Sequence, residues 1–255
     1  MYKTTEITSA EITSDNPVHQ RLLFPYVEAA QMVHGNVLEI GCGWGRGLEL
    51  LTQAADHYTG IDKNEDLIGS LQREYPQSTF IAANIPPLSG LADNTFDFIV
   101  TFQVIEHIEN DSLFVKEAHR VLKPGGKLLL TTVNKTFSLT RNPWHVREYV
   151  ADELRALMGQ HFPVIETRGI HGNDKVMTYY EQNKRSVERF TRWDIFNLQY
   201  RLPRRLLQVP YDIANRMNRN RLLQQDGLAA EILHTDYLVS ENPAGSLDFF
   251  YVATK

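Results

Sequence analysis

A glycine-rich segment that directly follows a short apolar run is the first place where chemistry is expected. Residues 37–47 read VLEIGCGWGRG, so the acid Glu39 stands just before Gly41, Gly43 and Gly45. Glycines allow a backbone to approach a ligand closely. In open α/β sheets, ligands bind at such turns, outside the carboxyl ends of the strands. A structural tight turn is the alternative, and Cys42 is expected to contact the ligand as a small loop residue rather than to act as a nucleophile.

A dinucleotide is the obvious rival ligand for this loop, because its fingerprint is G-x-G-x-x-G. The fingerprint does not fit, since counting from Gly41 places Arg46 at the third glycine position. Glu39 also argues against a pyrophosphate, because it would add like-charge repulsion where a helix N-terminus favours an anion. A ligand with an ammonium and a sulfonium suits the acid better, and S-adenosylmethionine carries both.

A second group of residues, His107, His145 and Glu148, could act on an acceptor. If the ligand is S-adenosylmethionine, transfer of its methyl group would be an in-line displacement, so holding the reactants in attack geometry would supply much of the acceleration. A general base is needed only where the acceptor must lose a proton, and His145 is then the first candidate. The alternatives are that His107 shapes the cofactor pocket and that His145 and Glu148 hold a surface loop. Scattered histidines and a single cysteine predict no metal site.

Strands alternate with helices over much of the chain, which predicts an α/β fold. The strand candidates are NVLEI, HYTGID, STFIA, FDFIVTF, GKLLLTTV, PVIETRGI and LDFFYVAT. Amphipathic segments such as NEDLIGSLQREY and DSLFVKEAHRVL lie between them. This pattern predicts a doubly wound, Rossmann-like sheet of seven strands, mostly parallel with an antiparallel last strand.

The chain divides into four parts on this pattern. We expect an N-terminal helical cap at 1–34, with its helix at 17–34, and a ligand-binding core at 35–171. A helical insertion follows at 172–242, with its helices broken near Pro203 and Pro210, and residues 243–255 return as the terminal strand of the core sheet. The insertion has helical apolar spacing, so one face must be buried, and the mouth of the ligand cleft is the nearest apolar surface.

The glycine segment resembles motif I of the class I S-adenosylmethionine-dependent methyltransferases. FIAANI, NTFDFIVTFQVIEHI and EAHRVLKPGGKLLLTT match further stretches of the type 11 and ubiquinone-biosynthesis-like members. The resemblance implies that Asp62 binds the ribose hydroxyls and that Lys63 contacts adenosine. Asn84 stands where the family usually has an aspartate facing the adenine amino group, which is a departure. Ile85 beside it and Gln103 after the fourth strand are also expected at the cofactor.

The composition excludes some functions. A formal charge of -5 over 255 residues gives no overall attraction to nucleic acid or to an anionic membrane. The polar beginning of the chain, the lack of an apolar run of membrane-spanning length and the single cysteine favour a cytoplasmic protein. The insertion, however, has more Lys and Arg than Asp and Glu. That excess fits an anionic or lipophilic acceptor or weak membrane-surface contact, while a solvated charged face is the alternative.

Three functions follow for comparison. The first is methyl transfer to a small-molecule acceptor at O, N or C. The second is methylation of RNA or protein through the basic insertion, although TFQV after the fourth strand lacks the Pro-Pro turn typical of enzymes that methylate nucleobase amino groups. The third is a non-catalytic module that only binds the cofactor. The identity of the acceptor and the oligomeric state do not follow from the sequence.

Overall fold

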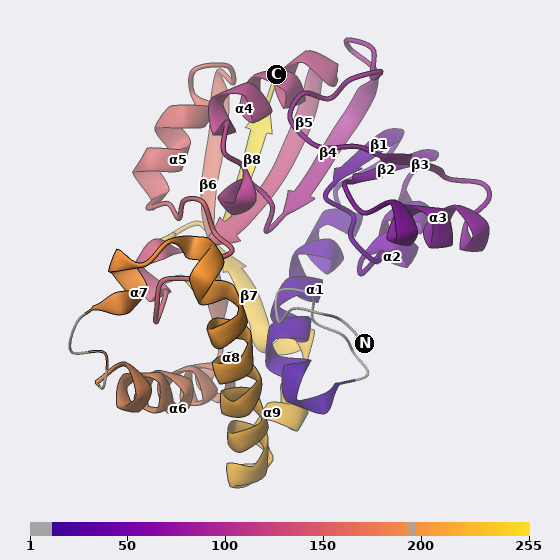
Figure 1. The fold of residues 1–255 in the computed structure, drawn as a ribbon. Helices are drawn as coiled ribbons and strands as arrows, with labels where there is room; N and C mark the ends of the chain where they lie inside the picture. The colour runs from indigo at the N-terminus through magenta and orange to yellow at the C-terminus, as the bar shows by residue number, and fades with distance from the viewer. Residues whose placement is uncertain (1–11, 193, 195–196) are drawn as a thin grey trace.

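The computed structural model describes residues 12–192, 194 and 197–255, and a sheet of eight strands forms the centre of this part of the chain (Figure 1). The strand order is β3-β2-β1-β4-β5-β8-β6-β7. Strands β1 to β5 are parallel, β8 is antiparallel to its neighbours β5 and β6, and β7 is antiparallel to β6. The strands are β1 Asn36–Ile40, β2 His57–Asp62, β3 Thr79–Ala82, β4 Phe96–Phe102, β5 Leu122–Val133, β6 Val164–Gly172, β7 Tyr237–Ser240 and β8 Asp248–Thr254.

The predicted mostly parallel sheet with an antiparallel last strand is confirmed, but the described residues form eight strands instead of seven. The additional strand is β7, which lies inside the range 172–242 where the sequence predicts only helices. Its four residues are too few to show a periodic pattern. It forms because Tyr237–Ser240 pairs with Gly169–Gly172 at the edge of β6.

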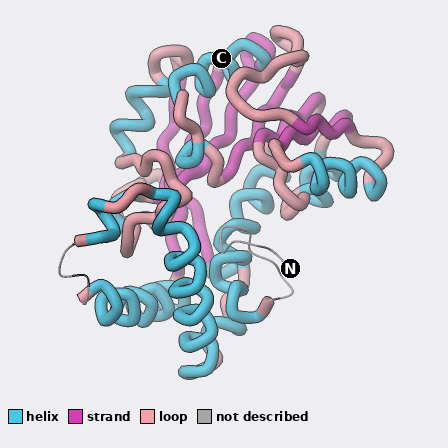
Figure 2. The backbone as a smooth tube through the Cα atoms, in the orientation of Figure 1, coloured by secondary structure: helices cyan, strands magenta, loops and turns pink. Residues whose placement is uncertain are grey.

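Helices cover both faces of the sheet (Figure 2). Successive strand residues point to opposite faces, so Val37 joins one apolar core and Leu38 joins the other. Residues of α1, α2 and α3 pack in the core of Val37, and residues of α4 and α5 pack in the core of Leu38. The bounds are α1 Asn16–Ala30, α2 Leu48–Ala54, α3 Glu65–Glu74, α4 Asp111–Val121 and α5 Ala151–Met158.

The insertion forms a group of helices beyond one end of the sheet, beside the N-terminal end of α1 (Figure 1). Ion pairs hold the insertion against the N-terminus of α1. The fully buried Asp15 lies 2.7 Å from Arg216 and 3.0 Å from Arg219 of the insertion. The Asn16 amide also donates to the backbone oxygens of Ala229 and Ile232, at 2.9 and 2.8 Å. The helices are α6 Asp174–Thr191, α7 Leu198–Arg201, α8 Arg204–Asp226 and α9 Leu228–Glu231.

Several element bounds differ from the expected ones. Helix α1 ends at Ala30, four residues before the expected end. Strand β5 begins at Leu122, four residues before the expected strand GKLLLTTV, and ends with it at Val133. Helix α8 begins after Pro203 as predicted, but it continues through Pro210, so the predicted break there is wrong. A proline removes one backbone donor, and burial of the inner face of α8 keeps the helix continuous around it.

Residues 1–11 of the expected N-terminal cap lie outside the described residues. Within the part of the chain that the structure does describe, no helix is both long and apolar enough to cross a membrane.

Candidate active site

The glycine loop connects β1 to α2 in a conformation that requires glycine. Gly41, Gly43 and Gly45 have φ angles of 82°, 53° and 86°, which residues with a side chain rarely adopt. A Cβ atom at Gly41 would lie 2.4 Å from Val104 Cγ2, whereas a Cβ at Gly43 would meet nothing within 4 Å. The backbone at Gly41 is therefore packed against the protein, and that at Gly43 borders open space where a ligand fits.

Asp62 lies at the carboxyl end of β2 and is bonded to this loop. Its Oδ2 accepts a 3.0 Å hydrogen bond from the Gly43 amide, and its Oδ1 accepts one of 2.9 Å from the Asn64 amide. The carboxylate is only half-buried, so further lone pairs remain for a ligand. Lys63 and Asn84 are exposed beyond the ends of β2 and β3, and Ile85 is half-buried.

Glu39 differs from expectation, because it is buried instead of facing the cleft. Only 1% of the residue is exposed, and burial raises the pKa of its carboxyl group. One oxygen accepts a 2.7 Å hydrogen bond from the Tyr26 hydroxyl, and the other accepts one from the Tyr58 hydroxyl. In this arrangement Glu39 links the start of the glycine loop to Tyr26 of α1 and Tyr58 of β2. Cys42 is also buried, and burial raises the pKa of its thiol, which suits a packing role more than a nucleophilic one.

Gln103 follows β4 and has a positive φ of 56°, a strained conformation for a residue with a side chain. Its amide nitrogen lies 3.2 Å from Asp248 Oδ1. The same buried carboxylate binds the Arg21 guanidinium through two hydrogen bonds, of 2.6 and 2.7 Å. This network joins the end of β4 to α1 and to the start of β8.

Glu106 and His107 lie in the short turn after Gln103, where burial shifts the pKa of both side chains. Burial raises the pKa of Glu106 to about 7, and Thr132 donates a 3.0 Å hydrogen bond to its carboxylate. Burial and the nearby His145 lower the pKa of His107 to about 4, so His107 is neutral at pH 7. His107 Nδ1 lies 3.1 Å from the Trp144 carbonyl oxygen and donates a hydrogen bond to it.

His145 and Glu148 come from the loop between β5 and α5 and form a hydrogen-bonded pair. His145 Nδ1 lies 2.7 Å from Glu148 Oε1, and the two side chains are only 10% and 15% exposed. Burial favours a neutral Glu148, but hydrogen bonds from His145 and Ser138 hold its pKa below the usual value. On the other side of the ring, Nε2 lies 2.9 Å from the Asn142 amide nitrogen.

The fold also brings together three ionisable side chains, Glu106, His107 and His145, that are not close together in the sequence. The histidines at 107 and 145 have ring centroids 5.0 Å apart. One ligand-type atom from each of Glu106, His107 and His145 lies within 4.8 Å of the others, a geometry that could hold a metal ion. The sequence predicts no metal site because its histidines are scattered and it has a single cysteine, and that expectation stays a prediction.

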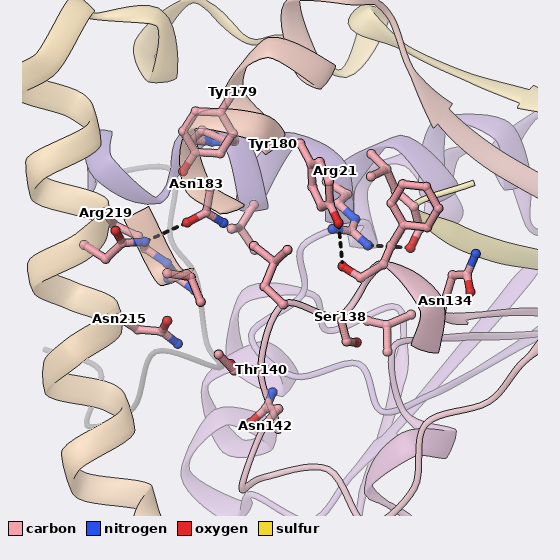
Figure 3. A pocket seen from close by; sticks show the side chains of 18 of the residues that line it. Arg21, Asn134, Ser138, Thr140, Asn142, Tyr179, Tyr180, Asn183, Asn215 and Arg219 are labelled. Carbon is pink, nitrogen blue, oxygen red and sulfur yellow. Dashed lines mark hydrogen bonds between the residues drawn. The ribbon is translucent and has the colours of Figure 1, made fainter. Parts of the chain in front are cut away.

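A cavity of about 240 Å³ lies between the insertion, α1 and the loop after β5; we call it the cap cavity. His145 and Glu148 form part of its wall, together with Arg21. Figure 3 shows Asn183 of α6, Asn215 of α8 and other polar side chains around the same space. Its polar and aromatic lining includes Arg21, Asn134, Ser138, Thr140, Asn142, His145, Glu148, Tyr179, Tyr180, Asn183, Tyr211, Asn215, Asn218, Arg219 and Tyr237.

Helix α1 also contacts the glycine loop directly. The His19 ring stacks on Trp44 at a centroid distance of 6.2 Å, and the Arg46 guanidinium lies 5.2 Å from the centre of the Trp44 ring. Burial and the nearby Arg46 lower the pKa of His19 to about 4. The N-terminal helix therefore covers one side of the loop through His19, while Arg21, two residues further along the helix, reaches the cap cavity.

Comparisons with known proteins agree with this geometry. Residues 38–130 match the family model described as a methyltransferase domain. A probable S-adenosylmethionine-dependent methyltransferase of Mycolicibacterium smegmatis is 37% identical over 177 residues, which are 66% of this chain and 68% of that protein. A probable S-adenosylmethionine-dependent methyltransferase of Mycobacterium tuberculosis is 38% identical, but the match spans 55% of this chain and only 51% of the relative. A ubiquinone biosynthesis O-methyltransferase of Psychrobacter arcticus is 30% identical, over 64% of this chain and 62% of that protein.

Among solved structures, a protein of Thermotoga maritima titled an S-adenosylmethionine-dependent methyltransferase, "possible histamine N-methyltransferase", has the same fold. Its TM-score is 0.58 at 16% identity, and the match covers 93% of this chain and 91% of that one. The chain belongs to the S-adenosylmethionine-dependent methyltransferases, and its cofactor is S-adenosyl-L-methionine. The open space at Gly43 and the half-buried Asp62 fit this cofactor.

Sequence reasoning missed several residues that build the site. Tyr26 and Tyr58 bind Glu39, Asp248 binds Arg21, and Asp15 binds Arg219. Each of these partners lies outside a recognisable motif. An acidic residue within the apolar terminal strand LDFFYVAT was the one available signal, because a buried aspartate needs a partner.

Proposed function

We propose that the enzyme transfers a methyl group from S-adenosylmethionine to a hydroxyl group of a small molecule bound in the cap cavity. The observation that carries this proposal is the 2.7 Å hydrogen bond between His145 and Glu148 in the wall of that cavity. The Psychrobacter relative is named an O-methyltransferase, which agrees with an oxygen acceptor. The sequence-based candidate for the base, His145, is kept, and its hydrogen bond to Glu148 makes Glu148 the proposed partner of the base.

The hydrogen bonds of His145 and Glu148 indicate how the two side chains would act as a general base. Glu148 is ionised and accepts a hydrogen bond from Nδ1–H of His145. The proton of the neutral imidazole is therefore on Nδ1, and Nε2 uses its lone pair to accept a hydrogen bond from the Asn142 amide. A hydroxyl that displaces the Asn142 amide would donate to the same lone pair, and its proton would pass to Nε2 as the oxygen attacks. S-adenosylmethionine supplies the electrophilic methyl group. Asp62 and the backbone near Gly43 are proposed to hold the cofactor, with Lys63, Asn84, Ile85 and Gln103 around it.

The polarity of the cavity favours a neutral acceptor over an anionic one. The two arginines in its wall are already neutralised, because Arg21 binds Asp248 and Arg219 binds Asp15. The rest of the lining combines amide and hydroxyl groups with apolar side chains such as Val133, Leu139 and Val176, which together match a neutral molecule that has hydroxyl groups and an apolar part. Arg185 and Arg189 of α6, and Arg192 just after it, are exposed and do not line the cavity, so they give no positive charge to a small acceptor bound there.

The grouping of Glu106, His107 and His145 favours a second way of activating the same hydroxyl. A divalent metal held there would bind the acceptor oxygen and lower the pKa of its proton. Dialysis against a chelator separates the two mechanisms. Activity that is lost on dialysis and restored by a divalent metal assigns these groups to a metal, whereas unchanged activity assigns His145 to proton transfer.

The proposal is tested by incubating the protein with methyl-labelled S-adenosylmethionine and separate pools of neutral polyols, phosphorylated metabolites, RNA and protein. Label is expected in the neutral hydroxyl-bearing pool, as a base-stable methyl ether. Label in RNA or protein alone would reject the small-molecule acceptor. The cytoplasmic location inferred from the sequence stays a prediction.

A further inference from the structure

The outer face of α8 carries a row of exposed apolar side chains. Leu206, Val209, Ile213 and Met217 are 65%, 67%, 57% and 61% exposed. Their spacing of three and four residues places them on one side of the helix, and they extend over about 16 Å of its length. We call these four residues the α8 stripe. Large apolar side chains that occur singly on a surface are ordinary, but a continuous row indicates contact with another apolar phase.

The stripe is separate from the face of α8 that serves the active site. Tyr211, Asn215 and Asn218 of the same helix line the cap cavity, and Leu222 is buried in the apolar core. The helix therefore has a polar and aromatic inner face toward the acceptor and an apolar outer face toward the surroundings. Packing within the described part of the chain explains the inner face and leaves the stripe exposed.

Positive charge surrounds the stripe. Residues 198–226 contain six arginines, of which Arg216 and Arg219 pair with Asp15, and two aspartates, Asp212 and Asp226. Arg205 precedes the stripe and Arg221 follows it, and both are exposed. Leu198 and Tyr200 of the neighbouring α7 add further exposed apolar surface, at 46% and 62%. An apolar row bordered by arginines is the composition of helices that lie in the headgroup region of anionic membranes.

We propose that the α8 stripe docks the enzyme on an anionic lipid surface. The helix would lie parallel to the membrane, with the stripe among the upper acyl carbons and Arg205 and Arg221 at the lipid phosphates. A second copy of the chain fits this surface less well. A two-fold symmetric contact would bring the same arginine-rich segment of each copy together, and like charges would oppose it.

Vesicle sedimentation tests the docking surface. The full chain is mixed with vesicles of phosphatidylcholine alone or with about 30% phosphatidylglycerol, at low salt and at about 0.5 M NaCl. The test variant is Ile213→Gln with Met217→Gln. The matched control is Val164→Gln with Leu238→Gln, which alters two apolar residues that are 54% and 49% exposed elsewhere on the surface.

The wild type and the control are expected to bind the anionic vesicles and to bind the zwitterionic ones much more weakly. The test variant is expected to lose at least about fivefold in partition coefficient, and high salt is expected to weaken binding by the wild type. Equal binding by the test variant, or no binding by the wild type, overturns the proposal. A concentration-dependent dimer in sedimentation velocity that the test variant alone abolishes would assign the stripe to a second copy and also overturns it.

Discussion

The backbone amide of Gly43 donates a 3.0 Å hydrogen bond to the Asp62 carboxylate, which ties the glycine loop to the end of the neighbouring strand. The motif that allows close approach of a ligand and the acid expected to bind its ribose are thus one structural unit. Substitution of either residue should therefore weaken cofactor binding more than it weakens binding of the acceptor.

Replacing Asp62 tests this unit. Asp62→Ala is expected to weaken S-adenosylmethionine binding by roughly 1–3 kcal/mol, because hydrogen bonds to a charged group are lost. Isothermal titration calorimetry measures the change. Asp56→Ala, at an exposed aspartate before β2, is the control and should bind normally. An affinity of Asp62→Ala equal to the wild type would remove Asp62 from the cofactor site.

Substitutions in the glycine loop should separate binding from folding. Gly43→Val is expected to abolish cofactor binding in a folded protein, because its side chain would enter the open space that we propose for the ligand. Some strain of about 1–2 kcal/mol accompanies the positive φ. Gly41→Val should lower the melting temperature further, since its Cβ would lie 2.4 Å from Val104 Cγ2. Circular dichroism and calorimetry together check both variants, and normal binding by folded Gly43→Val would place the ligand elsewhere.

The His145–Glu148 pair should affect turnover more than cofactor affinity. His145→Gln is expected to lower kcat about 10²–10⁴-fold, the usual contribution of general base catalysis. Glu148→Gln should lower it less, because His145 keeps its Nε2 but loses an ionised partner. His57→Gln at an exposed histidine is the control. Unchanged kcat in His145→Gln, with the acceptor saturating, would rule out this base.

The contact between α1 and the glycine loop should weaken in acid. The pKa of His19 is lowered to about 4, so the folded state prefers the neutral ring while the unfolded chain takes up a proton below about pH 6.5. The free energy of unfolding should therefore fall by about 1–2 kcal/mol between pH 7.5 and 5, with the loss complete near pH 4. Urea unfolding of the wild type and His19→Gln at both pH values measures it. A pH dependence that is the same in both proteins would assign the effect to other groups.

The sequence predicts the fold and the cofactor loop well because both depend on local patterns. NVLEI, HYTGID and FDFIVTF become β1, β2 and β4 without a change of bounds. The same is not true of Glu39, whose direct contact with the ligand was inferred from its charge alone. Its two tyrosine partners, Tyr26 and Tyr58, come from separate elements that no spacing rule connects.

The acceptor site is less predictable, since residues far apart in the chain build it. Arg21 and Asp248 are 227 positions apart, and Asp15 and Arg219 are 204 positions apart. Only the path of the chain shows that the charges of Arg21 and Arg219 are neutralised, and for this reason we propose a neutral acceptor where the sequence favours an anionic or lipophilic one. For the same reason, counting histidines along the sequence does not reveal the grouping of Glu106, His107 and His145.

The most direct test of the account is a crystal structure with S-adenosylhomocysteine bound. The ribose hydroxyls are expected to contact Asp62, and the sulfur is expected to face the cap cavity with His145 Nε2 within about 7 Å, which leaves room for one acceptor oxygen between them. A sulfur that faces away from the cavity, with His145 and Glu148 both well over about 10 Å from it, would contradict methyl transfer at this site.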